Sequence, residues 1–302
     1  MTEPGDWTGS VRGRGDDAPG RVTMVRPLTQ ARRSWSRPFE AEADDGRRYF
    51  VKSLDTCPRN ARASVAVEYL VARVGALIRA PIPETRLLRV PEGFAGWSPF
   101  PGRALTCGFA HAIVALPDCA DIREYPAEAD AENLRRLVAV HALYDWCWGR
   151  DPQWVYSGHE QPRLYTVDHG LYLEHFRRVG SRGSTFVPDA NRAHELRRPE
   201  SVELPGAAVE EVSSLLRAVS RTQLVEILNS VPASWPVGDT TLENLGWFLE
   251  HRAPQVAHRL EHSAQLAQPA QPAQAGRRDE PSATWAWKGQ THERHVARRA
   301  EG

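Results

Sequence analysis

The order of the expected secondary-structure elements constrains the fold of this chain more than any other feature. Alternating apolar patterns between residues 39 and 116 predict strands around a single helix, whereas residues 130–261 are mostly helical in pattern. A single shift of this kind is typical of an α+β architecture in which a small β-rich lobe precedes a larger helical one. The 302 residues, 41% of them apolar, are enough for a large core shared by two such lobes.

The individual elements follow from the spacing of apolar residues and from turn signals. Strands are expected at 39–43, 48–53, 85–90, 110–116 and, as a short hairpin, 154–156 and 163–167. Helices are expected at 60–78, 130–148, 207–218, 220–229 and 240–261. Pro254 lies inside the last helical pattern, so we expect it to break or kink that helix.

Composition divides the chain into four expected segments. Residues 1–20 are rich in Gly, Asp and Arg, and the region from about residue 264 repeats Gln-Pro-Ala, so both ends are expected to be disordered. The expected segments are a disordered N-terminus (1–20), a β-rich N-lobe (21–118), a helical C-lobe (119–262) and a disordered tail (263–302).

Charge and cysteine usage exclude several classes of protein. Basic and acidic residues number 38 each, so there is no overall field to attract nucleic acid or a membrane surface. The four cysteines are far apart and form no CxxC pair, which argues against a zinc knuckle or a disulfide scaffold. The N-terminus does not have the pattern of a signal peptide, and no apolar run approaches about 18 residues. We therefore expect a soluble, cytoplasmic protein.

Lys52 is the most unusual residue of the expected core. The chain has two lysines against 36 arginines, and the other lysine, Lys288, lies in the low-complexity tail. A chain this biased toward arginine is expected to keep lysine where a compact point charge is needed and a planar fork does not serve. One such task is to hold the phosphates of a nucleotide, with a carboxylate that fixes the lysine in place.

Three carboxylates follow Lys52 in the order that phosphoryl transfer requires. Glu68 lies near the middle of the next expected helix, Asp151 follows the long helix 130–148, and Asp168 follows the strand 163–167. The chemistry needs a lysine on the phosphates, a carboxylate that positions it, a base at the acceptor hydroxyl and a ligand for magnesium. Each residue alone has an ordinary explanation, such as a solvated glutamate or a turn aspartate. Their shared order favours the phosphoryl-transfer interpretation.

Four stretches of this sequence resemble the HipA-like kinases, a bacterial family with a protein-kinase and lipid-kinase-like fold. The resemblance is to the short branch of that family and extends over about residues 22–262. The stretches are Ser34 to Lys52, with Asp45-Gly46 and Tyr49-Phe-Val-Lys52; Ala66 to Glu84; Leu143 to Gly170, with Asp151-Pro-Gln-Trp154 and Thr166-Val-Asp-His-Gly170; and Val231-Pro-Ala-Ser-Trp235 with Leu249-Glu-His-Arg252.

The resemblance implies a two-lobed protein-kinase-like fold that uses ATP and Mg²⁺ and transfers the γ-phosphoryl group to a hydroxyl, usually Ser or Thr of a protein. Lys52 would contact the phosphates and Glu68 would pair with it. Asp151 would be the catalytic base, and Asp168 the Mg²⁺ ligand. A phosphate-covering loop would include Ser34, Ser36 and Arg37, and the hinge that meets adenine would fall near Leu116 to Asp118.

The sequence also departs from the better-known kinases. It has no GxGxxG, and no Asn follows Asp151 at the spacing that holds a second magnesium ion; Gln153 is the only amide nearby and is the candidate there. Two alternatives therefore stay open: a pseudokinase that binds a nucleotide or a partner without transfer, and a small-molecule kinase on the same fold. The acceptor is an unidentified protein or small molecule, with no nucleic-acid or membrane partner expected.

Overall fold

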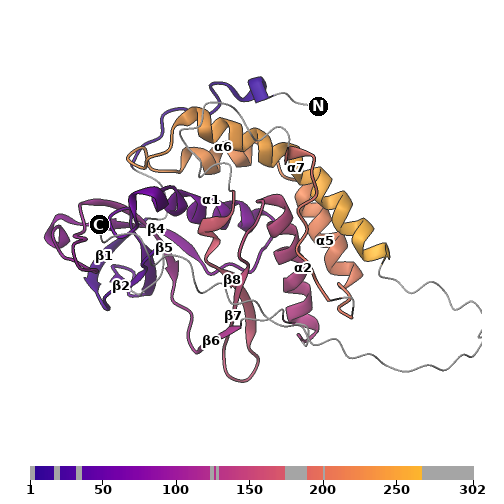
Figure 1. Cartoon of the computed structure of the whole chain (residues 1–302), viewed down its shortest axis with the longest axis horizontal. Helices are drawn as coiled ribbons and strands as arrows, with labels where there is room; N and C mark the ends of the chain where they lie inside the picture. The colour runs from indigo at the N-terminus through magenta and orange to yellow at the C-terminus, as the bar shows by residue number, and fades with distance from the viewer. Residues whose placement is uncertain are drawn as a thin grey trace, which may run out of the picture. The chain divides into compact units, whose positions relative to one another are not determined.

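The computed structural model describes residues 4–16, 21–31, 36–122, 126, 129–173, 189–199 and 201–266. Residues 4–266 of this set fall in one compact unit. Its first half is a small β-barrel with one main helix, and its second half is mostly helical, as Figure 1 shows from indigo to yellow. This is the α+β arrangement that the order of elements predicts.

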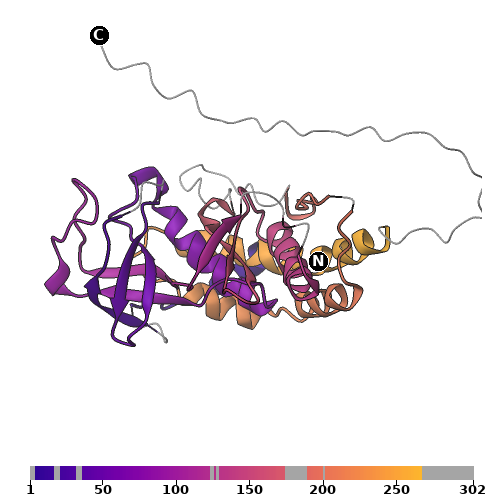
Figure 2. The same cartoon turned by 90° about the horizontal axis from the view of Figure 1, so that it is seen from below.

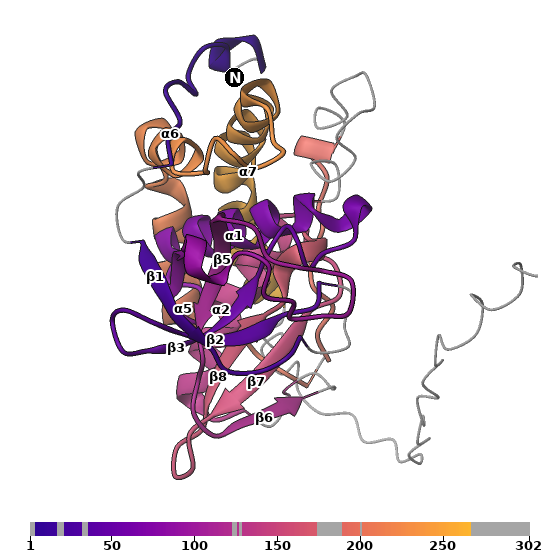
Figure 3. The same ribbon diagram turned by 90° about the vertical axis from the view of Figure 1, so that its left-hand side faces the viewer.

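Five strands close into a barrel in the order β1-β2-β3-β5-β4. Their bounds are β1 Val22–Pro27, β2 Phe39–Ala43, β3 Arg48–Lys52, β4 Thr85–Val90 and β5 Gly108–Val114. Parallel pairing of β1 with β4 closes the barrel, and its end is turned to the viewer in Figure 3. Sequence reasoning missed β1, whose residues alternate only over its first half before Arg26 and Pro27 face outward.

The barrel interior is filled by alternate residues of its strands. Tyr49 and Val51 of β3 point inward, as do Ala110 and Ala112 of β5. Because successive side chains of a strand point to opposite faces, Lys52 faces the outside of the barrel. On that side lies α1 (Ala63–Leu77), a helix that is buried around most of its circumference. The alternation of side chains along β3 thus points the lysine toward α1.

Within its described residues, the second half combines four helices with a small antiparallel sheet, which Figure 2 shows from below. The helices are α2 Ala131–Trp146, α5 Gly206–Arg217, α6 Arg221–Asn229 and α7 Asp239–Leu266. The strands are β6 Cys119–Ile122, β7 Gln153–Ser157 and β8 Arg163–Val167, in the order β6-β7-β8. The predicted hairpin 154–167 corresponds to β7 and β8, whereas the short strand β6 was not predicted. The lobe boundary at residue 118 stays a prediction.

The expectation that residues 1–20 are disordered is wrong for the residues that the structure describes there. Pro4–Trp7 form one turn of 3₁₀ helix, and Trp7 is fully buried against α7. The indole Nε1 donates to Glu250 at 2.8 Å, and Gly246 leaves the space that the ring fills. Figure 3 shows this segment beside α6 and α7. The segment is rich in Gly and Asp, which predicted disorder, but it contains one large aromatic side chain that packs into the core.

The last helix also differs from its prediction, because α7 continues through Pro254 to Leu266. An internal proline removes one backbone hydrogen bond, but packing on both sides of it can hold a helix together. Ala253, Val256 and Ala257 are all buried around the proline. The helical lobe therefore extends past residue 262, and the rest of the predicted tail lies outside the described residues. No helix in the described part of the chain is both long and apolar enough to cross a membrane.

Candidate active site

Lys52 and Glu68 meet between the barrel and α1. Both residues are buried, with 8% and 4% of their surface exposed, and the Lys52 ammonium donates to Glu68 Oε1. Burial acts to lower the pKa of Lys52, but the charges of Glu68 and Asp168 outweigh it and raise the pKa above its ordinary value. Lys52 therefore stays charged at any physiological pH, as a residue that holds phosphates requires.

Asp168 reaches the same ammonium from the second half of the chain. It follows β8 directly, and its Oδ1 lies 2.6 Å from Lys52 Nζ. Its side chain is 41% exposed, so one edge of the cluster opens to solvent. Removal from water raises the pKa of Asp168, Glu68 raises it further, and Lys52 opposes both. The structure thus brings together three of the four residues that the phosphoryl-transfer interpretation named.

Gly170 ties the segment after Asp168 to α1. Its backbone N–H donates to Glu68 Oε1 at 2.8 Å. A Cβ at this position would lie 3.1 Å from both Glu68 Oε1 and Ser64 Cβ. These contacts explain why glycine occupies this position: the chain passes too close to α1 for a larger side chain to fit without a shift of its neighbours.

Two buried histidines that sequence reasoning missed line the same cluster. His111 faces Lys52 across the β3–β5 pairing, and His169 follows Asp168 and shares a 3.0 Å hydrogen bond with Thr166. Burial, with the nearby Lys52 charge, lowers the pKa of each histidine to about 3. Both are neutral at physiological pH, so the cluster carries two carboxylates and one ammonium. The signal available in the sequence was a polar residue among small apolar ones in the strand Gly108–Val114.

Strand pairing places Asp151 and Asp168 at the same end of the β7–β8 hairpin. Gln153, the first residue of β7, pairs with Val167, the last residue of β8. Asp151 therefore precedes one strand where Asp168 follows the other. The Gln153 Nε2 donates to Asp151 Oδ2 at 3.1 Å. Because an amide nitrogen cannot ligate a cation, only the oxygen of Gln153 could serve as a metal ligand.

The end of α2 directs the chain toward Asp151. Gly149 N donates to Tyr144 O at 2.7 Å, and Trp148, in the left-handed conformation with φ 48°, donates from its N–H to Asp145 O at 3.3 Å. This pair of bonds is a Schellman motif, which ends a helix and reverses the chain. A Cβ on Gly149 would lie 2.4 Å from the Tyr144 ring, so this position requires glycine.

The structure describes three of the other predicted contact residues, Ser36, Arg37 and Leu116, all outside helices and strands. Ser34 falls outside the described residues. Ser36 is buried and its carbonyl accepts from Cys57 Sγ at 3.4 Å, which ties the predicted phosphate-covering loop to the segment after β3. The Arg37 guanidinium lies 4.0 Å from the centre of the Phe100 ring, in cation–π contact. Leu116, in the predicted hinge, lies between β5 and β6.

Left-handed backbone conformations gather in these loops. Among the described residues, seven other than glycine have positive φ, and four of them fall in the four segments predicted to touch a nucleotide or acceptor: Arg37, Asp118, Asp151 and Asp168. Such conformations cost on the order of 1–3 kcal/mol each and persist where the surrounding structure imposes them. Asp151 at φ 49° and Asp168 at φ 59° are therefore held, as a preorganised site requires.

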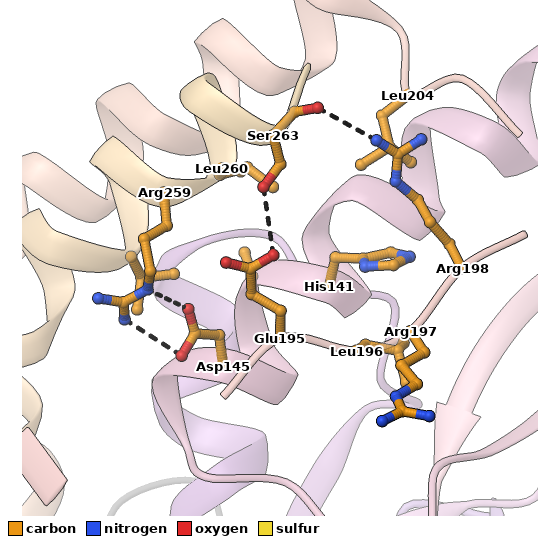
Figure 4. Close-up of a pocket in the computed structure, with 12 residues that line it drawn as sticks. His141, Asp145, Glu195, Leu196, Arg197, Arg198, Leu204, Arg259, Leu260 and Ser263 are labelled. Carbon is orange, nitrogen blue, oxygen red and sulfur yellow. Dashed lines mark hydrogen bonds and ion pairs between the residues drawn. The ribbon is translucent and has the colours of Figure 1, made fainter. Parts of the chain in front are cut away.

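A separate pocket of about 350 Å³ lies among α2, α7 and residues 195–204, shown in Figure 4. His141 and Asp145 of α2 and Arg259 of α7 contribute to its walls. Asp145 Oδ2 accepts from Arg259 Nε at 2.7 Å. Lys52, Glu68 and Asp168 do not line this pocket, which is distinct from the site described above.

Comparison with solved structures identifies the class of fold. The chain has a kinase-like fold: a kinase of Helicobacter pylori, the proinflammatory kinase CtkA, superposes with a TM-score of 0.52 at 9% identity, over 82% of this chain and 97% of that one. A Golgi casein kinase with Mn and ADP bound also matches, with a TM-score of 0.43 at 12% identity over 89% of this chain and 78% of that one. Among curated proteins no match was found.

The sequence itself adds a resemblance to a family. Residues 24–161, a little less than half of the chain, match the model of the HipA-like kinases, which confirms the resemblance over that range. The matched range includes Lys52, Glu68 and Asp151 and ends before Asp168. The fold is thus the one that the order of elements predicts, and the resemblance to the family rests on residues 24–161.

Proposed function

We propose that this chain is a HipA-like kinase that binds ATP with Mg²⁺ and transfers the γ-phosphoryl group to the hydroxyl of a protein Ser or Thr. The observation that carries the proposal is the convergence of Lys52, Glu68 and Asp168 on one site. An ammonium held by a buried carboxylate, next to a half-exposed aspartate, is the arrangement that phosphoryl transfer uses.

The charge balance of this site suits a cation. Two carboxylates share one ammonium, and the neighbouring histidines are neutral. The pKa of Asp168 is raised first by burial and further by the Glu68 charge, against the opposing charge of Lys52. No cluster of three metal-ligating His, Cys, Asp or Glu side chains occurs in the part of the chain that the structure describes. Mg²⁺ is commonly held by one or two carboxylates together with phosphate oxygens and water, so Asp168 fits it without a protein cage.

Each residue has a separate task in this proposal. Mg²⁺, when bound, neutralises charge on the transferring phosphoryl group. Lys52 contacts the phosphates, and Glu68 orients its ammonium. Asp151 accepts the proton of the acceptor hydroxyl, whose oxygen forms the new bond to the γ-phosphorus while the bond to the ADP oxygen breaks. Asp168 holds the cation beside the phosphates, and the hinge near Leu116 meets the adenine.

The test separates the two aspartates. Asp168→Asn should remove much of the Mg²⁺-dependent part of ATP affinity, whereas Asp151→Asn should keep ATP affinity and lower transfer by about 10²-fold or more, the scale for losing a positioned base. The control is Asp239→Asn at the exposed start of α7, which should change neither. Affinity is measured by calorimetry with and without Mg²⁺, and transfer with labelled ATP. Transfer that is unaffected by Asp151→Asn in an active parent would remove the assignment of the base.

One observation favours the pseudokinase alternative. The nitrogen of Gln153 is directed at Asp151, and no other amide side chain lies in the short loop between Asp151 and β7. A site with one Mg²⁺ ligand binds a nucleotide more readily than it completes transfer. This alternative predicts ATP binding without measurable transfer in the parent, and no effect of Asp151→Asn on either measurement.

A further inference from the structure

A buried arginine collects the carbonyl groups of two chain segments behind the loop that carries Asp151. Arg252 of α7 is fully buried, and its guanidinium donates to Asp145 O at 2.6 Å and contacts the Asp145 carboxylate. The same group donates to Asp189 O at 2.7 Å and to Arg192 O at 2.8 Å. It therefore fixes the segment 189–199 against the end of α2.

His194 extends from that fixed segment to the loop. Its backbone N–H donates to Asp145 Oδ1 at 3.0 Å, and its ring Nε2 lies 2.6 Å from Gly149 O. The ring stacks between two aromatic side chains, 5.2 Å from Tyr144 and 4.3 Å from Trp148 between ring centres. Because a carbonyl oxygen only accepts, Nε2 carries the proton in this contact. Burial lowers the pKa of His194, so the neutral ring with its proton on Nε2 is the species that donates.

The Gly149 carbonyl is where a restraint on the loop has most effect. Gly149 is the last residue of the Schellman motif and lies two positions before Asp151. Its N–H is already bonded to Tyr144 O. With the carbonyl bonded to His194, both polar groups of this glycine are fixed, and so is the direction in which the chain leaves toward Asp151.

We propose that His194 is a positioning residue for the transfer reaction: its Nε2–H holds the Gly149 carbonyl and thereby the loop that presents Asp151. The proposal rests on the proposed function, in which Asp151 is the base. Arg252 and Asp145 anchor the segment from which His194 acts. The stacked rings of Tyr144 and Trp148 hold the imidazole between them, and the hydrogen bond fixes the loop.

Two substitutions separate the hydrogen bond from the stacking. His194→Phe keeps an aromatic ring between Tyr144 and Trp148 but removes the donor. His194→Gln removes the ring but keeps an amide donor at a similar distance from the main chain. If the hydrogen bond positions the loop, the Phe variant should lose about 10- to 100-fold in kcat with an unchanged KM for ATP, the scale of a misplaced catalytic group. The Gln variant should recover most of that loss.

A matched control contacts the same segment from α7. His251 also stacks on an aromatic ring, 5.2 Å from Trp247 between ring centres, and its Nε2 contacts the Asn191 side chain at 2.8 Å. His251→Phe should leave kcat unchanged. A fall in kcat equal to that of His194→Phe would show that any loosening of the segment suffices, and would overturn the specific role of His194.

Hydrogen exchange distinguishes failure of this inference from failure of the proposed function. Amide exchange of residues 147–151 should accelerate about fivefold in His194→Phe, the scale for one lost hydrogen bond, and stay at the parent rate in His194→Gln. This measurement needs no activity. If exchange accelerates in His194→Phe but the parent protein transfers no phosphate, the restraint by His194 stands and the kinase proposal is refuted. Unchanged exchange in His194→Phe, or faster exchange in the Gln variant than in the Phe variant, would overturn the inference whatever the activity.

Discussion

Two charge clusters of this protein have opposite charge balance. The cleft cluster consists of Lys52 with Glu68 and Asp168, and the helix cluster consists of Asp145 with Arg252 and Arg259. The first has two anions for one cation, whereas the second has two cations for one anion. Both lie where a chain segment from one half of the molecule meets a helix, yet they are completed differently.

The helix cluster is completed by the protein itself. Carbonyl oxygens from three residues of the segment 189–192 accept from Arg252, so the excess positive charge is balanced by dipoles inside the fold. In the cleft cluster, one backbone N–H, that of Gly170, donates to Glu68, and the Asp168 edge is open to solvent. A cluster that is complete holds structure together, and a cluster that lacks one cation at an open edge is suited to binding. The predictions below test this distinction.

The largest effect is expected when the complete cluster is broken. Arg252→Met keeps the apolar stem but leaves the Asp145 carboxylate and several carbonyls with one partner fewer, and it should lower the free energy of unfolding by about 3–5 kcal/mol. The control is Arg217→Met, which removes an exposed pair with Glu261 and should leave the free energy of unfolding close to that of the parent. Urea denaturation measures both. Equal losses in the two variants would mean that the helix cluster contributes no more than a surface ion pair.

How far the sequence predicts these two clusters differs for a physical reason. Lys52 and Glu68 were found because composition isolates a lone lysine and because the nearest helix must pack on the strand that carries it. Asp145, in contrast, has partners that are 107 and 114 residues away in the sequence. Spacing carries no information on a pairing at that separation, and arginine is too common in this chain for one to stand out.

Acid should lower the free energy of unfolding through the buried histidine of the cleft cluster. The pKa of His111 is lowered from 6.5 to about 3 by burial, so the unfolded chain binds a proton that the folded protein excludes. Stability is complete above pH 6.5 and falls as the pH decreases toward 3, by about 1.4 kcal/mol per pH unit for each such histidine, or about 2 kcal/mol at pH 5.

The variant His111→Phe should remove one titrating group from the pH dependence of the unfolding free energy. Its unfolding free energy, measured in urea between pH 7 and pH 4.5, should therefore fall less steeply than that of the parent by about 1.4 kcal/mol per pH unit. His159→Phe, on the exposed β7–β8 turn, is the control and should have the slope of the parent. A parent slope in His111→Phe would show that the folded protein takes up the proton and that the cluster is not closed to acid on that side.

The shape of the Lys52 side chain should matter for ATP affinity as well as its charge. Lys52→Arg keeps the positive charge, but a planar fork cannot occupy the position of an ammonium between Glu68 and Asp168, so ATP affinity should fall about tenfold, which corresponds to about 1.4 kcal/mol. Lys52→Met should keep the fold and also lose phosphate binding. The reverse change Arg47→Lys, in an exposed pair on the β2–β3 hairpin, is the control. Parent affinity in Lys52→Arg would remove the reason to single out a lone lysine.

The neutral histidines and the buried N-terminal tryptophan show where sequence reasoning ended. His111 and His169 lie next to Lys52 only because β5 pairs with β3 and because η4 (His169–Leu171) packs on α1. Trp7 is buried only because Gly246, near the other end of the chain, leaves space for it. Local pattern predicted the strands, the helices and the order of the site residues. Contacts that depend on register or on a missing side chain needed the structure.

The smallest expected effect tests how tightly the cleft cluster is fitted. Gly170 has no left-handed backbone requirement among the positive φ values described, so alanine is resisted only by space. The added methyl would lie 3.1 Å from Glu68 Oε1 and must move that carboxylate by a few tenths of an ångström. Gly170→Ala should therefore cost about 1 kcal/mol of stability, at the low end for overpacking, and should lower ATP affinity a few-fold because Glu68 no longer orients Lys52.

Gly206→Ala, at the first position of α5 where an added Cβ meets nothing, is the matched control and should be neutral or slightly stabilising. Thermal unfolding and calorimetric titration with ATP measure both effects. If Gly170→Ala loses stability but binds ATP as the parent does, the contact between Gly170 and Glu68 serves the fold alone, and the difference between a cluster for structure and a cluster for binding disappears at this position.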